Sequence, residues 1–438
     1  MSLLARKPTF QGGIHPPDSK LTKEEGIKEI SPSGSLVIPL SQHIGAPAEP
    51  VVEEGETVRR GQKIGEAQGF VSCPVHASSS GEVTKIGKFR HPSGNEVEGI
   101  RIDLDGKDDS VELEESDPEK LSSEAILERI QQAGVVGMGG AAFPTHVKLS
   151  PPEDKNIDTL IINGAECEPY LTGDYRLMLE ETDKIIRGAN LIAELLGVEQ
   201  IYFGIEDNKP EAVKVIRDNT DDRTQVVELT TKYPQGWEKT LIHTITGRKV
   251  PVDGLPLDVG TVVQNVATVK AVWEGVRFGN PLTERVVTAT GTVKKPGNYK
   301  VRIGTRWEDL INQLGGLRKE RTAKLIDGGP MMGDTQPNQS TPIVKSTSGA
   351  LTLEKERAVD RDPSPCIRCG KCVDVCPANL LPTSIYKSVE SGDIEKAEEL
   401  NATACCECGS CTYVCPSEIP LVQWIVQGKS EIEKRQEE

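Results

Sequence analysis

The strongest constraint on this chain is the arrangement of its cysteines. Eight of its 11 cysteines lie near the C-terminus, in two runs with the same spacing, Cys-x-x-Cys-x-x-Cys-x-x-x-Cys-Pro. The first run contains Cys366, Cys369, Cys372 and Cys376, and the second contains Cys405, Cys408, Cys411 and Cys415. Four thiolates in so short a segment must fold around whatever they bind, so the ligand dictates the local structure.

This spacing is typical of segments that hold cubane iron–sulfur clusters, so the two runs predict two 4Fe-4S clusters. In two-cluster ferredoxins, the fourth cysteine of each run binds the other cluster. We therefore predict one cluster on Cys366, Cys369, Cys372 and Cys415 and the other on Cys405, Cys408, Cys411 and Cys376. Structural zinc takes two separated cysteine pairs and disulfide frameworks belong to small secreted domains, so neither fits the two runs.

Length and charge narrow the class of protein. The chain has 438 residues, enough for about three or four domains, and a formal net charge of −16, which makes nucleic acid an unsuitable partner. No apolar run approaches the roughly 20 residues of a membrane span, and residues 1–13 lack the apolar stretch of a secretory signal. We expect a protein of the reducing cytoplasm, either soluble or attached to a membrane through partners.

The N-terminal part divides into an arm and a small β domain. Residues 1–30 are polar and predict an extended arm. Residues 31–105 contain short strands between glycine turns, which predicts a barrel or sandwich. The segments 54–65 and 80–83 resemble the biotinyl and lipoyl barrels, but residues 75–77, Val-His-Ala, replace the modified lysine of those families. A docking or scaffold module is therefore expected, rather than a swinging arm.

The remainder of the chain predicts three further units in a multidomain α/β protein. Residues 121–280 alternate helix and strand, which predicts a parallel, doubly wound sheet with ligands at the carboxyl ends of its strands. Residues 284–335 have a strand–strand–helix order that suggests a β-grasp domain, and residues 336–355 read as a polar connector. The helical two-cluster ferredoxin domain occupies about 360–420, and the last ten residues read as a charged tail.

A glycine-rich loop opens the α/β region. It reads Gly-Met-Gly-Gly-Ala-Ala-Phe-Pro-Thr-His-Val-Lys over residues 137–148. Glycines allow the backbone to approach an anionic ligand, whose charge loop N–H groups and Lys148 would complement. Glycine clusters are often only turns, but this one occurs in a chain with two predicted redox clusters, which favours a nucleotide or flavin site.

At these residues the chain resembles a known family. The loop is similar to the Gly-x-Gly-Gly-Ala-x-Phe-Pro motif of the flavin-bearing, NADH-oxidising subunit of respiratory complex I, and segments 162–169, 233–239 and 264–268 resemble further motifs of that subunit. The order of barrel, flavin domain, β-grasp domain and two-cluster ferredoxin resembles that of the RnfC family, part of the Rnf electron transport complexes, over nearly the whole chain.

The resemblance implies a membrane-associated complex that couples electron flow between reduced ferredoxin and NAD to sodium or proton transport. It implies FMN and NAD(H) beside the two clusters, a position at the cytoplasmic face of the membrane, and other Rnf subunits as partners, among them integral membrane proteins and a ferredoxin-like cluster subunit. The implied FMN phosphate and ribityl contacts are Gly137, Gly139, Gly140 and Lys148. Residues implied to line the flavin are Asn163, Glu166, Gly236, Gln264, Asn265 and Thr268. Those implied to face the nicotinamide nucleotide are Phe143, Glu168 and Glu238.

Under this hypothesis no side chain acts as acid or base, because the redox chemistry belongs to the cofactors. Two alternatives remain open at this point. A cobalamin reductase of bacterial microcompartments shares the flavin, β-grasp and cluster parts. A cluster-only wiring protein would contain a glycine loop with a purely structural role.

Overall fold

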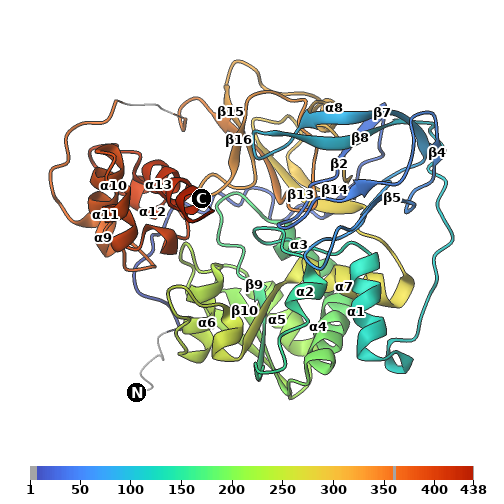
Figure 1. Cartoon of the computed structure of the whole chain (residues 1–438), viewed down its shortest axis with the longest axis horizontal. Helices are drawn as coiled ribbons and strands as arrows, with labels where there is room; N and C mark the ends of the chain where they lie inside the picture. The colour runs from blue at the N-terminus through green and yellow to red at the C-terminus, as the bar shows by residue number, and fades with distance from the viewer. Residues whose placement is uncertain (1–6, 359–361, 438) are drawn as a thin grey trace.

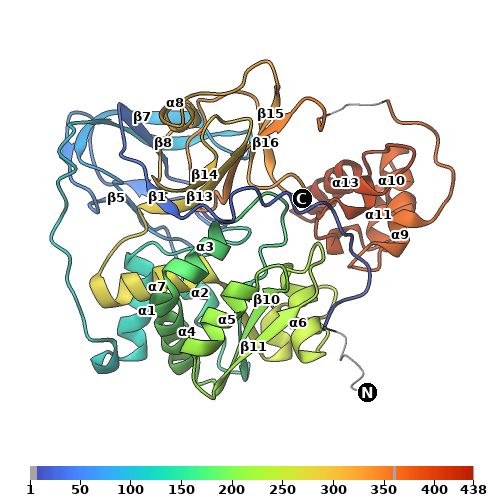
Figure 2. The same ribbon diagram turned by 180° about the vertical axis from the view of Figure 1, so that it is seen from behind.

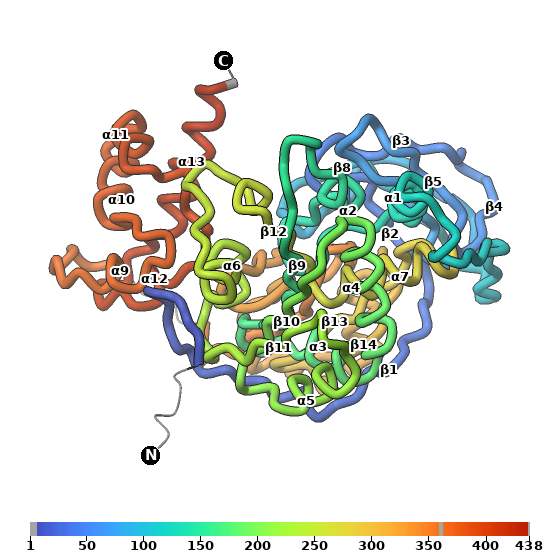
Figure 3. Tube along the Cα trace, turned by 90° about the horizontal axis from the view of Figure 1, so that it is seen from below, coloured from blue at the N-terminus to red at the C-terminus, as the bar shows by residue number. Residues whose placement is uncertain are grey.

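The computed structural model describes residues 7–358 and 362–437, so the first six residues of the predicted arm lie outside the described part. The chain is a multidomain α/β protein with four units (Figure 1). Seen from below, the C-terminal helices lie on one side of the molecule and the N-terminal strands on the opposite side, with the α/β unit between them (Figure 3).

The N-terminal unit consists of two small sheets that share one core. The first has the order β2-β8-β7-β4, and the second has the order β3-β5-β6. Alternate residues of β2, Leu36 and Ile38, point into the core, where Val83, Ile100 and Ile102 pack against them. The strands are β2 (Ser35–Pro39), β3 (Glu49–Pro50), β4 (Thr57–Val58), β5 (Lys63–Glu66), β6 (Val75–His76), β7 (Gly81–Arg90) and β8 (Glu96–Leu104).

The α/β unit contains a parallel sheet in the order β11-β10-β9-β12. The chain adds β10 and β11 on one side of β9 and then returns to place β12 on the other side. The strand order therefore reverses between β9 and β12, which is where sheets of this kind bind ligands. The strands are β9 (Thr159–Gly164), β10 (Gln200–Glu206), β11 (Thr224–Leu229) and β12 (Thr261–Asn265).

Helices cover both faces of this sheet. Leu160 and Ile162 of β9 belong to the large core that contains α4 and α7, whereas Ile161 packs with Leu241 and Ile242 of α6 on the other face. A strand buried on both faces is expected to be a continuous apolar run, as β9 is. The helices are η1 (Pro118–Lys120), α1 (Ser123–Gln132), α2 (Thr145–Lys148), α3 (Gly173–Glu180), α4 (Thr182–Leu196), α5 (Pro210–Asn219), α6 (Glu238–Thr246), η2 (Pro256–Val259) and α7 (Val266–Phe278).

The third unit is a six-stranded sheet in the order β1-β14-β13-β17-β15-β16. The strand–strand–helix order expected from the sequence is present, but the sheet continues past residue 335. Residues predicted as a polar connector contain β17, a buried strand parallel to β13 and antiparallel to β15. The elements are β1 (Ile27–Glu29), β13 (Glu284–Gly291), β14 (Gly297–Arg302), α8 (Trp307–Gln313), β15 (Thr322–Asp327), β16 (Asp334–Gln336) and β17 (Gly349–Glu354).

The N-terminal arm connects three of these units. Strand β1, within the arm, pairs in parallel with β14, and Ile14 forms a β-bridge with Tyr233 of the α/β unit. The Gly13 N–H donates to the carbonyl of Val375 in the C-terminal unit at 2.8 Å. Figure 2 shows this arm running from β1 to the C-terminal helices. It is therefore extended, as predicted, but also packed along its length.

The C-terminal unit is helical around the two cysteine runs. Its last helix, α13, includes most of the residues predicted as a charged tail, because Ile425 and Ile432 form one buried face that packs on α10. The elements are α9 (Lys371–Asp374), α10 (Pro382–Glu390), α11 (Ile394–Glu399), η3 (Ala402–Ala404), α12 (Ser410–Tyr413) and α13 (Leu421–Glu437).

A buried lysine lies where three units meet. The Lys345 side chain, which precedes β17, is 1% exposed. Its Nζ donates to the Pro74 carbonyl of the barrel unit at 3.1 Å and to the Gly134 carbonyl of the α/β unit at 2.7 Å. Burial lowers the pKa of Lys345 from 10.5 to about 8.

This lysine predicts a pH dependence of stability. Between pH 8 and 10.5 the unfolded chain binds more protons at this position than the folded chain, so folding is favoured increasingly as the pH rises. The full gain is about 3 kcal/mol. Below pH 8 the contribution is constant. We expect the melting temperature of the wild type to rise relative to that of Lys345→Met between pH 8 and pH 10, measured by circular dichroism. Parallel pH profiles for the two proteins would contradict this prediction.

Candidate functional site

The eight motif cysteines line two separate cavities. One cavity is lined by Cys366, Cys369, Cys372 and Cys415. The other is lined by Cys376, Cys405, Cys408 and Cys411, with Cys406 beside them. We call these the outer and the inner cluster cavity. The fourth cysteine of each run thus lies with the first three of the other run, which is the grouping that crossed ligation requires.

The two runs have the same local backbone. Arg368 and Glu407 occupy equivalent positions and both adopt left-handed conformations, with φ of 56° and 59°. Each turns its N–H toward a sulfur of its own run, Arg368 to Cys366 Sγ at 3.4 Å and Glu407 to Cys405 Sγ at 3.3 Å. Amide donors of this kind stabilise thiolate charge and adjust cluster potentials. The donor set therefore fits a 4Fe-4S cluster in each cavity.

Burial distinguishes the two cavities. Cys369 of the outer cavity is exposed, whereas Cys408 and Cys411 of the inner cavity are buried. The inner cavity lies against the α/β unit, because the Tyr233 hydroxyl donates to the Cys408 carbonyl at 2.8 Å. Cys167 and Met331 pack in the same small apolar cluster. The inner cavity is therefore the one in contact with the carboxyl ends of the parallel strands.

The glycine loop lies beside the reversal point of the sheet. Its ends are joined by a hydrogen bond from the Gly137 N–H to the Phe143 carbonyl at 2.9 Å. The Met138 N–H donates to Thr268 Oγ1 at 2.9 Å, so the loop is attached to the first turn of α7. Gly139 and Gly140 are exposed. A Cβ on Gly139 would lie 2.9 Å from Asn265 Nδ2, so a side chain at this position would collide with the end of β12.

The strand ends present polar groups to the same region. Asn163, at the end of β9, donates from Nδ2 to the Gly236 carbonyl at 2.9 Å. Gln264, at the end of β12, is buried, and its Nε2 has no hydrogen-bond partner among the described residues. A buried donor without a partner is costly unless a ligand completes it. The glycine cradle and this donor fit a flavin bound where β9 and β12 end.

Lys148 and Glu238 meet across this region. Lys148 ends α2 and Glu238 begins α6, and the two side chains form an ion pair. Both groups are about one-third exposed, so the pair is open to exchange with an incoming anion or cation. The structure therefore brings together two residues that the resemblance assigned to different ligands, FMN phosphate and the nicotinamide nucleotide.

Glu166 and Glu168 use their carboxylates within the protein. Glu166 accepts from the Asp174 N–H at 2.7 Å, at the start of α3. Glu168 accepts from the N–H groups of Met331 and Met332 at 3.1 and 2.8 Å. Burial raises the pKa of Glu168 to about 7, and these two donors oppose the shift. In this structure both carboxylates are directed toward neighbouring segments, which differs from the cofactor-facing roles implied by the resemblance. Phe143 is half-buried beside the loop.

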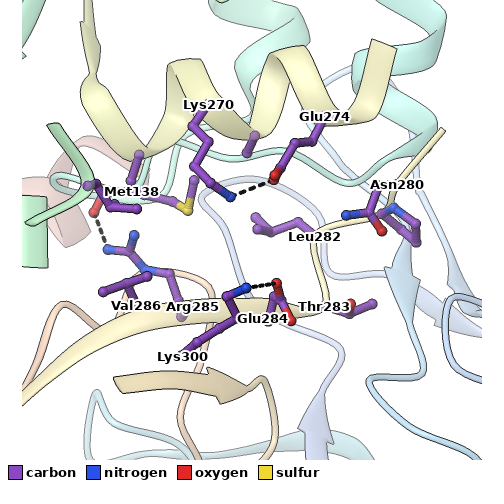
Figure 4. Close-up of a pocket in the computed structure, with 14 residues that line it drawn as sticks. Met138, Lys270, Glu274, Asn280, Leu282, Thr283, Glu284, Arg285, Val286 and Lys300 are labelled. Carbon is purple, nitrogen blue, oxygen red and sulfur yellow. Dashed lines mark hydrogen bonds and ion pairs between the residues drawn. The ribbon is translucent and has the colours of Figure 1, made fainter. Parts of the chain in front are cut away.

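A small pocket of about 40 Å³ lies behind the glycine loop, between α7 and β13 (Figure 4). Lys270 pairs with Glu274 there at 2.7 Å, and Lys300 pairs with Glu284 at 3.6 Å. Arg285 reaches Met138, on the loop itself. The pocket lies at a joint between units and away from the strand ends, so it does not define the cofactor site.

Three residues at the site were missed by sequence reasoning. Tyr233 links the inner cavity to the α/β unit, and Lys20 and Arg285 contact loops of that unit from the arm and from β13. No local pattern distinguishes them, because each acts across more than 140 positions of sequence. The available signal was Tyr233 within segment 233–239, which resembled complex I.

Family models match four stretches of the chain. They are the RnfC barrel sandwich hybrid domain over residues 8–107, the Nuo51 FMN-binding domain over 130–274, the SLBB domain over 286–335, and the 4Fe-4S dicluster domain over 358–416. The order of the models follows the order of the four structural units.

Full-length relatives are also similar. The RnfC-type protein of the proton-translocating ferredoxin:NAD(+) oxidoreductase complex of Clostridium ljungdahlii is 49% identical, over 86% of this chain and 83% of the relative. Its counterpart in the Na(+)-translocating ferredoxin:NAD(+) oxidoreductase complex of Acetobacterium woodii is 46% identical, over 89% of each chain. Among solved structures, an H2-reduced NAD+-reducing [NiFe]-hydrogenase aligns over 71% of this chain and 63% of that one, at 19% identity and a TM-score of 0.47, too low to support an argument.

Proposed function

This chain belongs to the RnfC family, whose members are subunits of ion-translocating ferredoxin:NAD+ oxidoreductase complexes, and we propose that it connects NAD(H) to one-electron carriers through FMN and two 4Fe-4S clusters. When bound, FMN exchanges a hydride with NAD(H) and single electrons with a cluster, which is the conversion that neither partner can perform alone.

One observation supports this function above the others. Tyr233 belongs to the loop that leads to Gly236 at the proposed flavin site, and its hydroxyl donates to the carbonyl of Cys408 in the inner cavity at 2.8 Å. The segment that would line the flavin therefore contacts the segment that would hold a cluster. Such contact keeps the two centres close and excludes water between them, which one-electron transfer between them requires.

The flavin-binding role falls to residues around the end of β9 and β12. Backbone amides at Gly137, Gly139 and Gly140, with Lys148, hold the phosphate, and Asn163, Gly236, Gln264, Asn265 and Thr268 hold the remainder. Phe143 and Glu238 face the nicotinamide nucleotide. Glu166 and Glu168 contribute by fixing the loop after β9, given the backbone amides that their carboxylates accept.

The two clusters have different positions in this proposal. The inner cluster exchanges electrons with the flavin, because its cavity contacts Tyr233 and Cys167. The outer cluster exchanges electrons with a partner, because Cys369 and Ile367 at its cavity are exposed. Crossed ligation joins the two cavities through short covalent segments.

The chain works as one subunit among several, as the names of its relatives state. No helix within residues 7–358 and 362–437 is long and apolar enough to cross a membrane. We propose attachment to integral membrane subunits at the cytoplasmic face, with a ferredoxin-like cluster subunit among the partners. Release from native membranes by moderate salt, with the other subunits present, is the expected behaviour, and full recovery in the soluble fraction would contradict it.

Anaerobically purified protein provides the test of function. We expect flavin absorbance that NADH bleaches, together with about eight irons per chain. Protein with about eight irons and no flavin would instead indicate cluster-only wiring. Rapid NADH-dependent reduction of cobalamin would indicate the cobalamin reductase, which the relatives do not favour.

A further inference from the structure

The loops of the proposed flavin site are held by buried cations from outside the α/β unit. Arg285, on β13, is 3% exposed, and Lys20, in the arm, has a side chain that is 7% exposed. Burial lowers the pKa of each group, so their retention in the interior needs compensating partners. Those partners include backbone carbonyls of the two loops at the strand ends.

Arg285 holds the glycine loop. Its Nη2 donates to the Met138 carbonyl at 2.8 Å, as Figure 4 shows, and its Nε donates to the Thr347 carbonyl at 3.1 Å. The Met138 N–H is already bound to Thr268. Both backbone groups of Met138 are therefore fixed from opposite sides, which sets the direction in which the chain enters Gly139 and Gly140.

Lys20 holds the loop that follows β9. Its Nζ donates to the carbonyls of Glu166, Glu168 and Leu171 at 2.8, 3.1 and 2.6 Å. The three donors of one ammonium group are thus all used by one loop. Glu166 itself is left-handed, with φ of 46°, a conformation that a residue with a side chain keeps only when its surroundings impose it.

The two loops are also joined to each other. Asp174 is the charged group that most favours the protonated form of Arg285, and its Oδ2 accepts from Asn265 Nδ2 at 2.6 Å. Asn265 in turn packs against Gly139. A continuous set of contacts therefore connects β13, the start of α3, the end of β12 and the glycine loop.

We propose that Arg285 and Lys20 are positioning residues of the flavin site, which holds its cofactor-binding geometry only when the arm and the six-stranded sheet are docked on the α/β unit. This inference rests on the proposed function for the identity of the cofactor. The bracing itself is independent of that identity, because it concerns contacts within the chain.

Matched substitutions in the full-length protein provide the test. Arg285→Met and Lys20→Met retain length and remove the donors. Arg302→Met is the control for the first, because Arg302 lies on the adjacent strand and bonds Asp108 and Glu284 instead. Lys23→Met is the control for the second, because Lys23 lies on the same arm with an exposed side chain paired to Glu24.

Two measurements are made on each variant. Hydrogen exchange of flavin-free protein is expected to become at least about 10-fold faster over residues 137–143 in Arg285→Met and over 164–172 in Lys20→Met, because local opening replaces bracing. The Kd for FMN is expected to rise at least about 10-fold in both, with iron content unchanged. The control variants are expected to match the wild type in both measurements.

Unchanged loop exchange and unchanged FMN affinity in Arg285→Met and Lys20→Met would overturn the proposal. An equal loss in the control variants would also overturn it, because the effect would then be general destabilisation. If Arg285→Met does not fold, Arg285→Lys retains the charge but cannot span two carbonyls, and its Kd should lie between the wild type and a full loss. A wild type that binds no FMN would contradict the proposed function, while the exchange rates would still decide the bracing.

Discussion

Replacing Cys376 by alanine is expected to destroy the cluster whose other ligands are Cys405, Cys408 and Cys411, and to leave the cluster nearer in sequence intact. The reason is the inner cavity, which Cys376 lines together with those three residues. Iron should fall from about eight to about four per chain. Flavin reduction by NADH should persist, while electron transfer to an external acceptor should fall by more than about 100-fold, since the inner cluster is the connection to the flavin.

Electron paramagnetic resonance of the reduced protein identifies the cluster that is lost. The spectrum of Cys376→Ala should lack the signal that Cys405→Ala lacks and retain the one that Cys366→Ala lacks. Cys406→Ala is the matched control, because Cys406 lines the same cavity but has no assigned ligand role. Loss of the Cys366 signal in Cys376→Ala would show that ligation is not crossed.

Gly139→Val is expected to abolish FMN binding while the clusters remain. A Cβ at Gly139 would lie 2.9 Å from Asn265 Nδ2 and 3.0 Å from Asn265 Cβ. Asn265 cannot withdraw easily, because Nδ2 is bound to Asp174 and Oδ1 caps α7 through the Ala267 N–H at 2.8 Å. The loop must therefore move away from the strand end. We expect FMN affinity to fall by more than about 100-fold, or about 2.8 kcal/mol.

The measurement is fluorescence titration of flavin-free protein with FMN, with iron content as the check on folding. Gly87→Val in β7 is the control, since a Cβ there meets only Lys85 Cε at 3.5 Å, an ordinary contact. Wild-type affinity in Gly139→Val would mean that the cofactor does not depend on the approach of this loop to β12.

Most of the α/β unit could be predicted because its signals are local. The apolar run at β9, the proline at the start of α5 and the alternation of strand and helix require no knowledge of distant residues. The cysteine runs are equally local, and their spacing alone gave the grouping of ligands found in the two cavities.

The remaining features depend on distant contacts. Strand β17 was predicted as a connector because threonines and serines surround it, yet Thr352 is fully buried, with its hydroxyl bonded to the Thr290 carbonyl. The helical character of residues after 428 was missed because charges outnumber apolar residues there, although Ile432 is 1% exposed. The directions of Glu166 and Glu168 depend on α3 and on the loop at Met331, which no sequence motif reveals.

The packed arm has a consequence for the order of biogenesis. The arm leaves the ribosome first, but its partners at residues 298–300 and 375 leave it late. Domains generally fold in the order in which they are synthesised, so the α/β unit forms its core before the arm can settle. Cofactor insertion is then a step that follows chain completion, and a nascent or truncated chain that lacks the second cysteine run would remain an unfilled precursor.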